Sequence, residues 1–280
     1  MKNLPAWFAF FSLILSFSLF ASFNAFAKVG SPPSDPGVLL FQKADGVIFF
    51  LLILSFVSGL YVIKSIGSGA LNATFTAFLE GILLIGLSRL FAFFSFQGVY
   101  QISSASLHFW WHLLFYLGML AFIWGGSRLK DLSTNASPEK FGFRNQTFLG
   151  LLLLTALAIF VFPNSLESAL SPVLTGSMIE SSGLLHLAAI VLAGAAGSTM
   201  LYIRHHWGRL LSVSSLPLLA FLVLSAVQHL WELAAGSWKL VVVPSQTIER
   251  VDQLIAIPAF IFLIASMLRV AQVVRSQLRP

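Results

Sequence analysis

Residues 103–125 read SSASLHFWWHLLFYLGMLAFIWG and contain no Asp, Glu, Lys or Arg. A helix needs about 20 mostly apolar residues to cross the hydrocarbon core of a bilayer, so this stretch is long enough to span one. It nevertheless carries two histidines, His108 and His112. Residues four apart lie on one face of a helix. The stretch therefore predicts a membrane-spanning helix with a polar site on one face.

The composition of the whole chain agrees with this. Of its 280 residues 58% are hydrophobic and 9% are charged, and the mean hydropathy is +0.90. Soluble domains have about 25% charged residues, so the composition is typical of a membrane protein in contact with lipid. The net charge of +6 comes mostly from short loops and indicates topology, so we expect no nucleic-acid partner. The chain has no cysteine, which excludes disulfides, thiolate chemistry and cysteine-held iron–sulfur clusters.

The N-terminal region has the features of an export signal. Residues 1–27 start with Lys2, continue through a Phe-rich apolar run and end in Ala-Phe-Ala. This pattern predicts a secretory signal peptide or, if it is not cleaved, a first spanning helix. Residues 28–45 would follow as an external segment, and their SPPSDPG run cannot be helical throughout.

The remaining apolar stretches predict an all-α fold, a polytopic transmembrane helical bundle over residues 46–272. It would have about seven spanning helices after the signal peptide, or eight if that segment is retained. The seven predicted spans are 46–65, 72–96, 105–126, 146–163, 181–203, 213–235 and 251–270. The fourth is the shortest, and residues 273–280 form a terminal tail.

The loop charges predict an orientation. Alternate loops and the C-terminal end collect basic residues, whereas the other loops hold Glu167 and Glu180, with Lys239 and Arg250 as exceptions. Cytoplasmic loops of membrane proteins carry an excess of Lys and Arg. We therefore expect a multi-pass protein of the inner or plasma membrane, with its N-terminus outside and its C-terminus in the cytoplasm. The basic residues of the predicted inner side include Lys64, Arg128, Lys130, Lys140, Arg144, Arg204, Arg209, Arg269, Arg275 and Arg279.

Three further polar residues enter the predicted spans from the outer side: His186, His229 and Glu232. At about 1.5 Å of rise per residue, His112, His186 and His229 each lie about 7–10 Å below the outer boundary. Charged and polar groups at such depth usually face protein or water rather than lipid. The three imidazoles could therefore converge. The alternative is that each is an interfacial or core histidine satisfied by a hydrogen bond.

The first functional hypothesis is a metal or haem site near the outer face. His108, His112, His186 and His229 are the candidate metal ligands, and Glu232 is a further ligand or the catalytic base. Imidazole suits zinc, copper and iron. In a variant of this hypothesis two of the histidines hold one b-type haem that exchanges electrons with quinone. No C-x-x-C-H motif is present, which excludes covalently attached haem.

The second hypothesis is a transporter or sensor, and the third is a non-catalytic subunit of a membrane complex. Glu80, Arg89 and Glu232 would carry substrate or protons in the second. Nine residues separate Glu80 from Arg89, which puts them on opposite helix faces about 13 Å apart, so they do not pair. Arg89 could instead meet Glu232 or bind an anionic group of a cofactor. Asp252 is expected to cap the last helix.

The predicted topology can be compared with two known membrane-protein architectures. Seven helices with an external N-terminus resemble the microbial rhodopsins, but residues 251–270 lack the lysine that a Schiff base would need. Membrane zinc hydrolases of the ceramidase and adiponectin-receptor type also combine a His-x-x-x-His pair with another histidine. Here that pair lies on the third predicted span rather than the last, so the sequence indicates neither family.

Overall fold

The computed structural model describes residues 36–66, 70–96, 104–133, 142–166, 168, 182–206 and 208–278. The chain divides into two compact units, Met1–Ala44 and Asp45–Pro280. The predicted signal segment 1–27 lies outside the described residues. Within them every regular element is a helix and there are no strands, so the predicted all-α bundle is confirmed.

The helices follow the predicted order. They are α2 (Pro36–Ile66), α3 (Ala70–Phe96), α4 (Ser104–Ser133), α5 (Gly142–Val161), α7 (Ser182–His206), α8 (Gly208–Trp231), the π-helical turn η2 (Glu232–Ser237) and α9 (Ser245–Leu278). Six of them are long and apolar enough to cross a membrane: α2, α3, α4, α7, α8 continuing through η2, and α9. In α5 the apolar part is shorter, Thr147–Val161. Its helix stops just before Pro163, since a proline disfavours helical geometry in the residue before it.

Most of the helices begin earlier than the hydropathy pattern predicts, and the difference is largest for α2 and α9. α2 starts at Pro36, so part of the expected external segment 28–45 is helical. Proline fits the first turn of a helix because the amide hydrogen that it lacks has no partner there anyway. α9 starts at Ser245 rather than 251, through the polar residues SQTIER. Hydropathy marks the apolar length of a helix, but polar residues can extend its ends.

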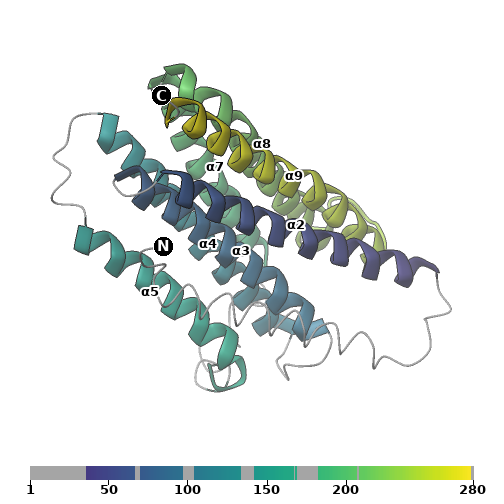
Figure 1. Ribbon diagram of the computed structural model, residues 1–280. Helices are drawn as coiled ribbons and strands as arrows, with labels where there is room; N and C mark the ends of the chain where they lie inside the picture. Colours follow the sequence, from purple (N-terminus) through teal and green to yellow (C-terminus); the bar gives the residue numbers. More distant parts are fainter. Residues whose placement is uncertain are drawn as a thin grey trace. The chain divides into compact units, whose positions relative to one another are not determined.

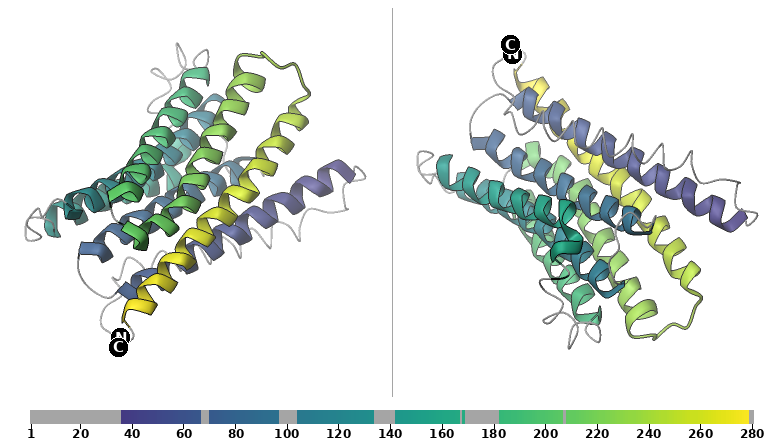
Figure 2. Two further views of the ribbon diagram at one scale, coloured as in Figure 1. Left: turned by 90° about the horizontal axis from the view of Figure 1, so that it is seen from above. Right: turned by 90° about the horizontal axis from the view of Figure 1, so that it is seen from below.

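Neighbouring helices of the Asp45–Pro280 unit pack in a simple series: α3 on α4, α4 on α7, α7 on α8 and α8 on α9. Figures 1 and 2 show α8 and α9 running side by side. Because consecutive members of the pairs α3–α4, α7–α8 and α8–α9 are joined by short connections, they run antiparallel. The C-terminal ends of α3 and α8 therefore meet the N-terminal ends of α4, α7 and α9.

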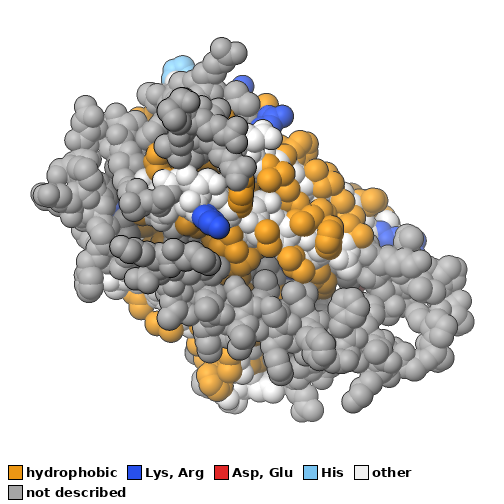
Figure 3. All heavy atoms as spheres, in the orientation of Figure 1, with side chains coloured by type: hydrophobic (Ala, Val, Ile, Leu, Met, Phe, Trp, Pro, Cys, Tyr) orange, Lys and Arg blue, Asp and Glu red, His pale blue; other side chains and the backbone are white. Residues whose placement is uncertain are grey.

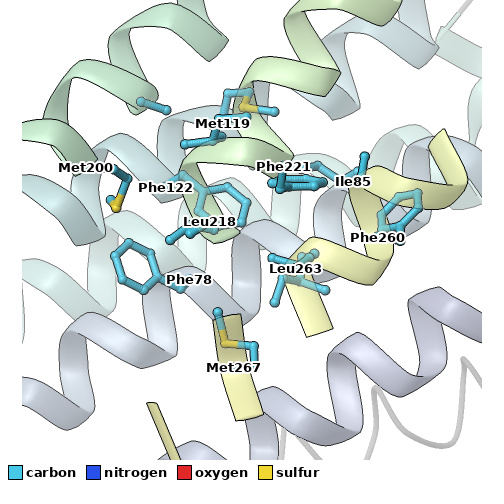
Figure 4. Packing of buried hydrophobic residues seen from close by; sticks show 14 of the residues in the cluster. Phe78, Ile85, Met119, Phe122, Met200, Leu218, Phe221, Phe260, Leu263 and Met267 are labelled. Carbon is cyan, nitrogen blue, oxygen red and sulfur yellow. The ribbon is translucent and has the colours of Figure 1, made fainter. Parts of the chain in front are cut away.

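Aromatic rings connect four of these helices through the core (Figure 4). Phe78 of α3 stacks on Phe122 of α4 at 5.8 Å, Phe122 lies 5.9 Å from Phe221 of α8, and Phe221 lies 5.9 Å from Phe260 of α9. Apolar side chains also form large patches on the described part of the face seen in Figure 3, where they are orange. Large ones such as Leu184, Val191, Val223 and Leu254 are exposed. This surface suits contact with lipid.

Glycines bring α3 and α4 close together. A Cβ atom added at Gly118 would lie 2.7 Å from Cγ1 of Ile85 and 3.0 Å from the carbonyl oxygen of Gly81. One added at Gly81 would lie 2.8 Å from the Phe122 ring. Small residues at such positions let membrane helices approach closely, which is how these two helices pack.

Candidate metal centre

Three histidines and one glutamate converge at one end of the bundle. His112 lies in the third turn of α4, His186 near the start of α7 and His229 in the last turn of α8. Glu232 opens the π-helical turn that follows α8. One ligand atom from each of the four lies within 4.8 Å of the others, so the group could hold a metal ion. The convergence predicted from the depths of the three histidines is thus found.

The contacts are short and centre on His186. Its Nδ1 lies 3.1 Å from Nε2 of His112, 3.3 Å from Nδ1 of His229 and 3.2 Å from Oε2 of Glu232. Nδ1 of His229 is also 3.2 Å from Oε2 of Glu232. Zinc bonds of about 2.0–2.1 Å in a tetrahedron place neighbouring ligand atoms about 3.3–3.4 Å apart. Four of the six separations therefore match the edges of a metal coordination shell.

The three imidazoles are sealed from solvent, with exposed fractions of 0%, 2% and 1% for His112, His186 and His229. Phe115 packs against the His229 ring at 4.4 Å, and Trp111 lies 4.7 Å from the His112 ring. Buried polar groups are normally hydrogen-bonded, so each nitrogen needs a partner.

The second ring nitrogen of His112 has a hydrogen-bond partner outside the cluster. Its Nδ1 lies 2.7 Å from the backbone carbonyl oxygen of His108. A carbonyl only accepts, so Nδ1 carries the hydrogen and Nε2 of the neutral ring presents its lone pair to the cluster. Metal-binding histidines are commonly oriented by a hydrogen bond of this kind.

Hydrogen bonds among the four groups cannot satisfy all the contacts. Nδ1 of His186 carries at most one hydrogen but faces three acceptor or donor atoms at 3.1–3.3 Å. Oε2 of Glu232 is buried, and no described residue directs a hydrogen at it with hydrogen-bonding geometry. Lone pairs therefore face one another across the centre of the cluster. A bound cation would satisfy all of them at once.

The π-helical turn forms part of the site. After His229 the helix widens, and the amide of Trp238 donates to the carbonyl of Leu233, 2.8 Å away and five residues earlier. Such turns often occur at functional sites in helices. The indole Nε1 of Trp231 donates to the carbonyl of Ile248 over 3.1 Å, which fastens this turn to α9. The hydropathy pattern of the sequence does not predict this turn.

His108 lies outside the converging group. Its side chain is exposed, and its ring centre is 5.5 Å from that of His112 and 5.7 Å from that of His186. It stacks on Trp111 at 5.9 Å. His108 takes part in the described cluster through its backbone carbonyl, which orients His112.

Arg89 forms an ion pair with Asp252, with Nη1 3.0 Å from Oδ2, whereas the sequence had suggested Glu232 or an anionic ligand as its partner. Its guanidinium also lies over the ring of Trp111, 5.5 Å from the centre. Asp252 was expected to cap the last helix. Because α9 begins at Ser245, it lies well inside the helix and cannot cap it.

Glu80 lies near the middle of α3 and is not among the converging residues. It is buried, and its Oε1 has no hydrogen-bond partner among the described residues. As expected from their spacing, Glu80 and Arg89 do not pair, since Arg89 binds Asp252. A transport role for Glu80 remains a prediction.

No known protein family, curated protein or solved structure matches the chain. The geometry of the chain's own residues is therefore the basis for the proposals below.

Proposed function

We propose that this chain is an integral membrane protein that binds one transition-metal ion through His112, His186, His229 and Glu232. The observation that carries the proposal is the convergence of four ligand atoms, from three helices and a π-helical turn, within 4.8 Å of one another. Packed helices hold these residues in place.

The ligand set suits zinc. Three imidazole nitrogens and one carboxylate oxygen also suit copper and iron, but they contain no thiolate that would select copper(I). Oε2 of Glu232 lies as close to two imidazole nitrogens as those nitrogens lie to each other. This spacing supports Glu232 as the fourth ligand over a separate catalytic base. A bound zinc ion would act as a Lewis acid toward any further ligand.

The same geometry supports a single ion over haem b. In a haem, the porphyrin nitrogens take four positions on the iron, which leaves at most two for protein residues. Here four protein atoms converge, and the ring centres of His112 and His186 are only 4.5 Å apart. A porphyrin placed between those rings would have to separate them. Quinone as a partner of a haem remains a prediction without support from this geometry.

Purified full-length protein should contain about one zinc, copper or iron per chain and show no Soret band. Elemental analysis and an absorption spectrum of the protein in detergent measure both. A chain with stoichiometric haem would overturn the choice of a simple ion. A colourless protein that stays metal-free after incubation with each ion would overturn the site and leave the transporter, sensor and subunit hypotheses.

We also propose that the metal site faces away from the cytoplasm. The opposite end of the helices carries most of the described basic side chains: Lys64, Arg128, Lys130, Arg204 and Arg269. Arg128 and Lys130 lie over the rings of Trp124 and Tyr202, 4.4 Å and 4.9 Å from their centres. Basic and aromatic residues gather in this way at a cytoplasmic membrane interface.

Single cysteines can test this orientation, because the chain has none of its own. Val242 is exposed in the segment before α9, and Arg204 is exposed at the far end of α7. Each is replaced by cysteine in a separate variant. On intact cells, a membrane-impermeant thiol reagent should label Val242→Cys and should label Arg204→Cys only after the cells are opened. The reverse pattern would contradict the proposed orientation.

A further inference from the structure

Polar side chains that the proposed metal site does not use lie beside it on α3, α4, α8 and α9. Arg89 is paired with Asp252 and lies over the Trp111 ring. That ring is 4.7 Å from the ring of His112 and 5.8 Å from that of His229. Gln228 of α8 is one turn before Glu232, the first residue of η2, so the two lie on the same helix face.

Three of these side chains have a buried atom that lacks a hydrogen-bond partner among the described residues. The atoms are Nε2 of Gln228, Nε1 of Trp111 and Oδ1 of Asp252. The three residues are only 5%, 8% and 9% exposed. An unpaired buried polar group costs about 1–3 kcal/mol, so these three atoms indicate a ligand that the described residues do not supply. That ligand must accept two hydrogen bonds and donate one.

The charges indicate the sign of the ligand. A divalent ion and Arg89 contribute three positive charges, and Glu232 and Asp252 contribute two negative ones, while metal-bound imidazoles are neutral. One positive charge is left over. An unbalanced charge inside a protein is unfavourable, so the site is completed by one negative charge.

We propose that the metal centre takes a small oxyanion of single negative charge beside Arg89. Its oxygen atoms accept hydrogen bonds from Gln228 and Trp111. Asp252 Oδ1 accepts a hydrogen bond from a hydroxyl group of the same ligand. Hydrogen carbonate has this combination of features, whereas nitrate has the same planar shape and charge but no hydrogen. This inference rests on the proposed metal site.

Cobalt(II) in place of zinc gives a visible spectrum that responds to a new ligand on the ion. Hydrogen carbonate and nitrate, each titrated into the cobalt-loaded full-length protein, serve as probes. We expect a saturable spectral change with hydrogen carbonate and binding at least about tenfold weaker for nitrate, the effect of one hydrogen bond to a charged group. No response to hydrogen carbonate, or equal affinity for both anions, would overturn the proposal.

Three variants on different helices extend the test: Trp111→Phe, Gln228→Leu and Asp252→Asn. The first two should weaken hydrogen carbonate binding by about tenfold each, and the third should remove the preference over nitrate. Trp110→Phe is the matched control, because Trp110 is also buried but its ring contacts Phe109 rather than a histidine. If one of these variants no longer binds cobalt, the other two variants still test the oxyanion site.

The two proposals fail in different ways. A wild-type protein that does not bind cobalt at all contradicts the metal site. A protein that binds cobalt stoichiometrically, but whose Trp111→Phe and Gln228→Leu variants take hydrogen carbonate as well as Trp110→Phe does, contradicts only the oxyanion site.

Discussion

Replacing His186 by alanine should abolish stoichiometric metal binding. Its Nδ1 is the atom that contacts all three other ligand groups, at 3.1–3.3 Å. Changing a residue that only orients a metal ligand typically lowers the metal affinity by about 10- to 100-fold. The loss of affinity in His186→Ala should be larger than this. Competition with a chelator of known affinity, followed by elemental analysis, measures it.

His205→Ala is the matched control for this prediction. His205 is exposed near the far end of the same helix, α7, so this change removes an imidazole without touching the cluster. It should leave the metal content at about one ion per chain. If His186→Ala retained the wild-type affinity while remaining folded, the four residues would not be the ligands.

Gly118→Val should destabilise the bundle strongly. The new side chain would meet Ile85 at 2.7 Å and the backbone of Gly81 at 3.0 Å, and a backbone atom cannot move aside as a flexible side chain can. Overpacking of this kind destabilises by about 1–3 kcal/mol or more. We expect the melting temperature in detergent to fall by about 5–10 °C, since 1 kcal/mol corresponds to about 2–4 °C for a chain near this size.

Gly194→Val provides the comparison. A Cβ atom at Gly194 of α7 would have no atom within 4 Å, so the same change of residue type should have a much smaller effect. Equal melting temperatures for the two variants would show that α3 and α4 do not pack as closely as described.

Much of the site could be predicted from the sequence because successive spanning helices cross the membrane in alternating directions. In a spanning helix, the number of residues from its end gives the depth in the membrane. His112 and His186 follow the starts of their helices, and His229 precedes the end of its own. The three histidines were therefore predicted to lie at the same depth, and in the structure they converge. The prediction did not require knowing which helices are in contact.

Other features depend on details that hydropathy does not contain. Asp252 was expected to be a cap because the predicted span began at 251, whereas hydrogen bonding extends α9 back to Ser245. The π-helical turn at Glu232 arises from a shift of one residue in backbone hydrogen bonding, which leaves the apolar pattern unchanged. His108 shares a helix face with His112, but it lies one turn nearer the helix end, where its side chain is exposed.

X-ray absorption at the zinc edge of the purified, zinc-loaded full-length chain reports which atoms bind the ion. We expect three imidazole nitrogens and a carboxylate oxygen at about 2.0–2.1 Å from the ion, with one more oxygen when an oxyanion is bound. Scattering from oxygen atoms alone, or from a single imidazole, would mean that the ion binds elsewhere and that the three buried histidines do not hold it.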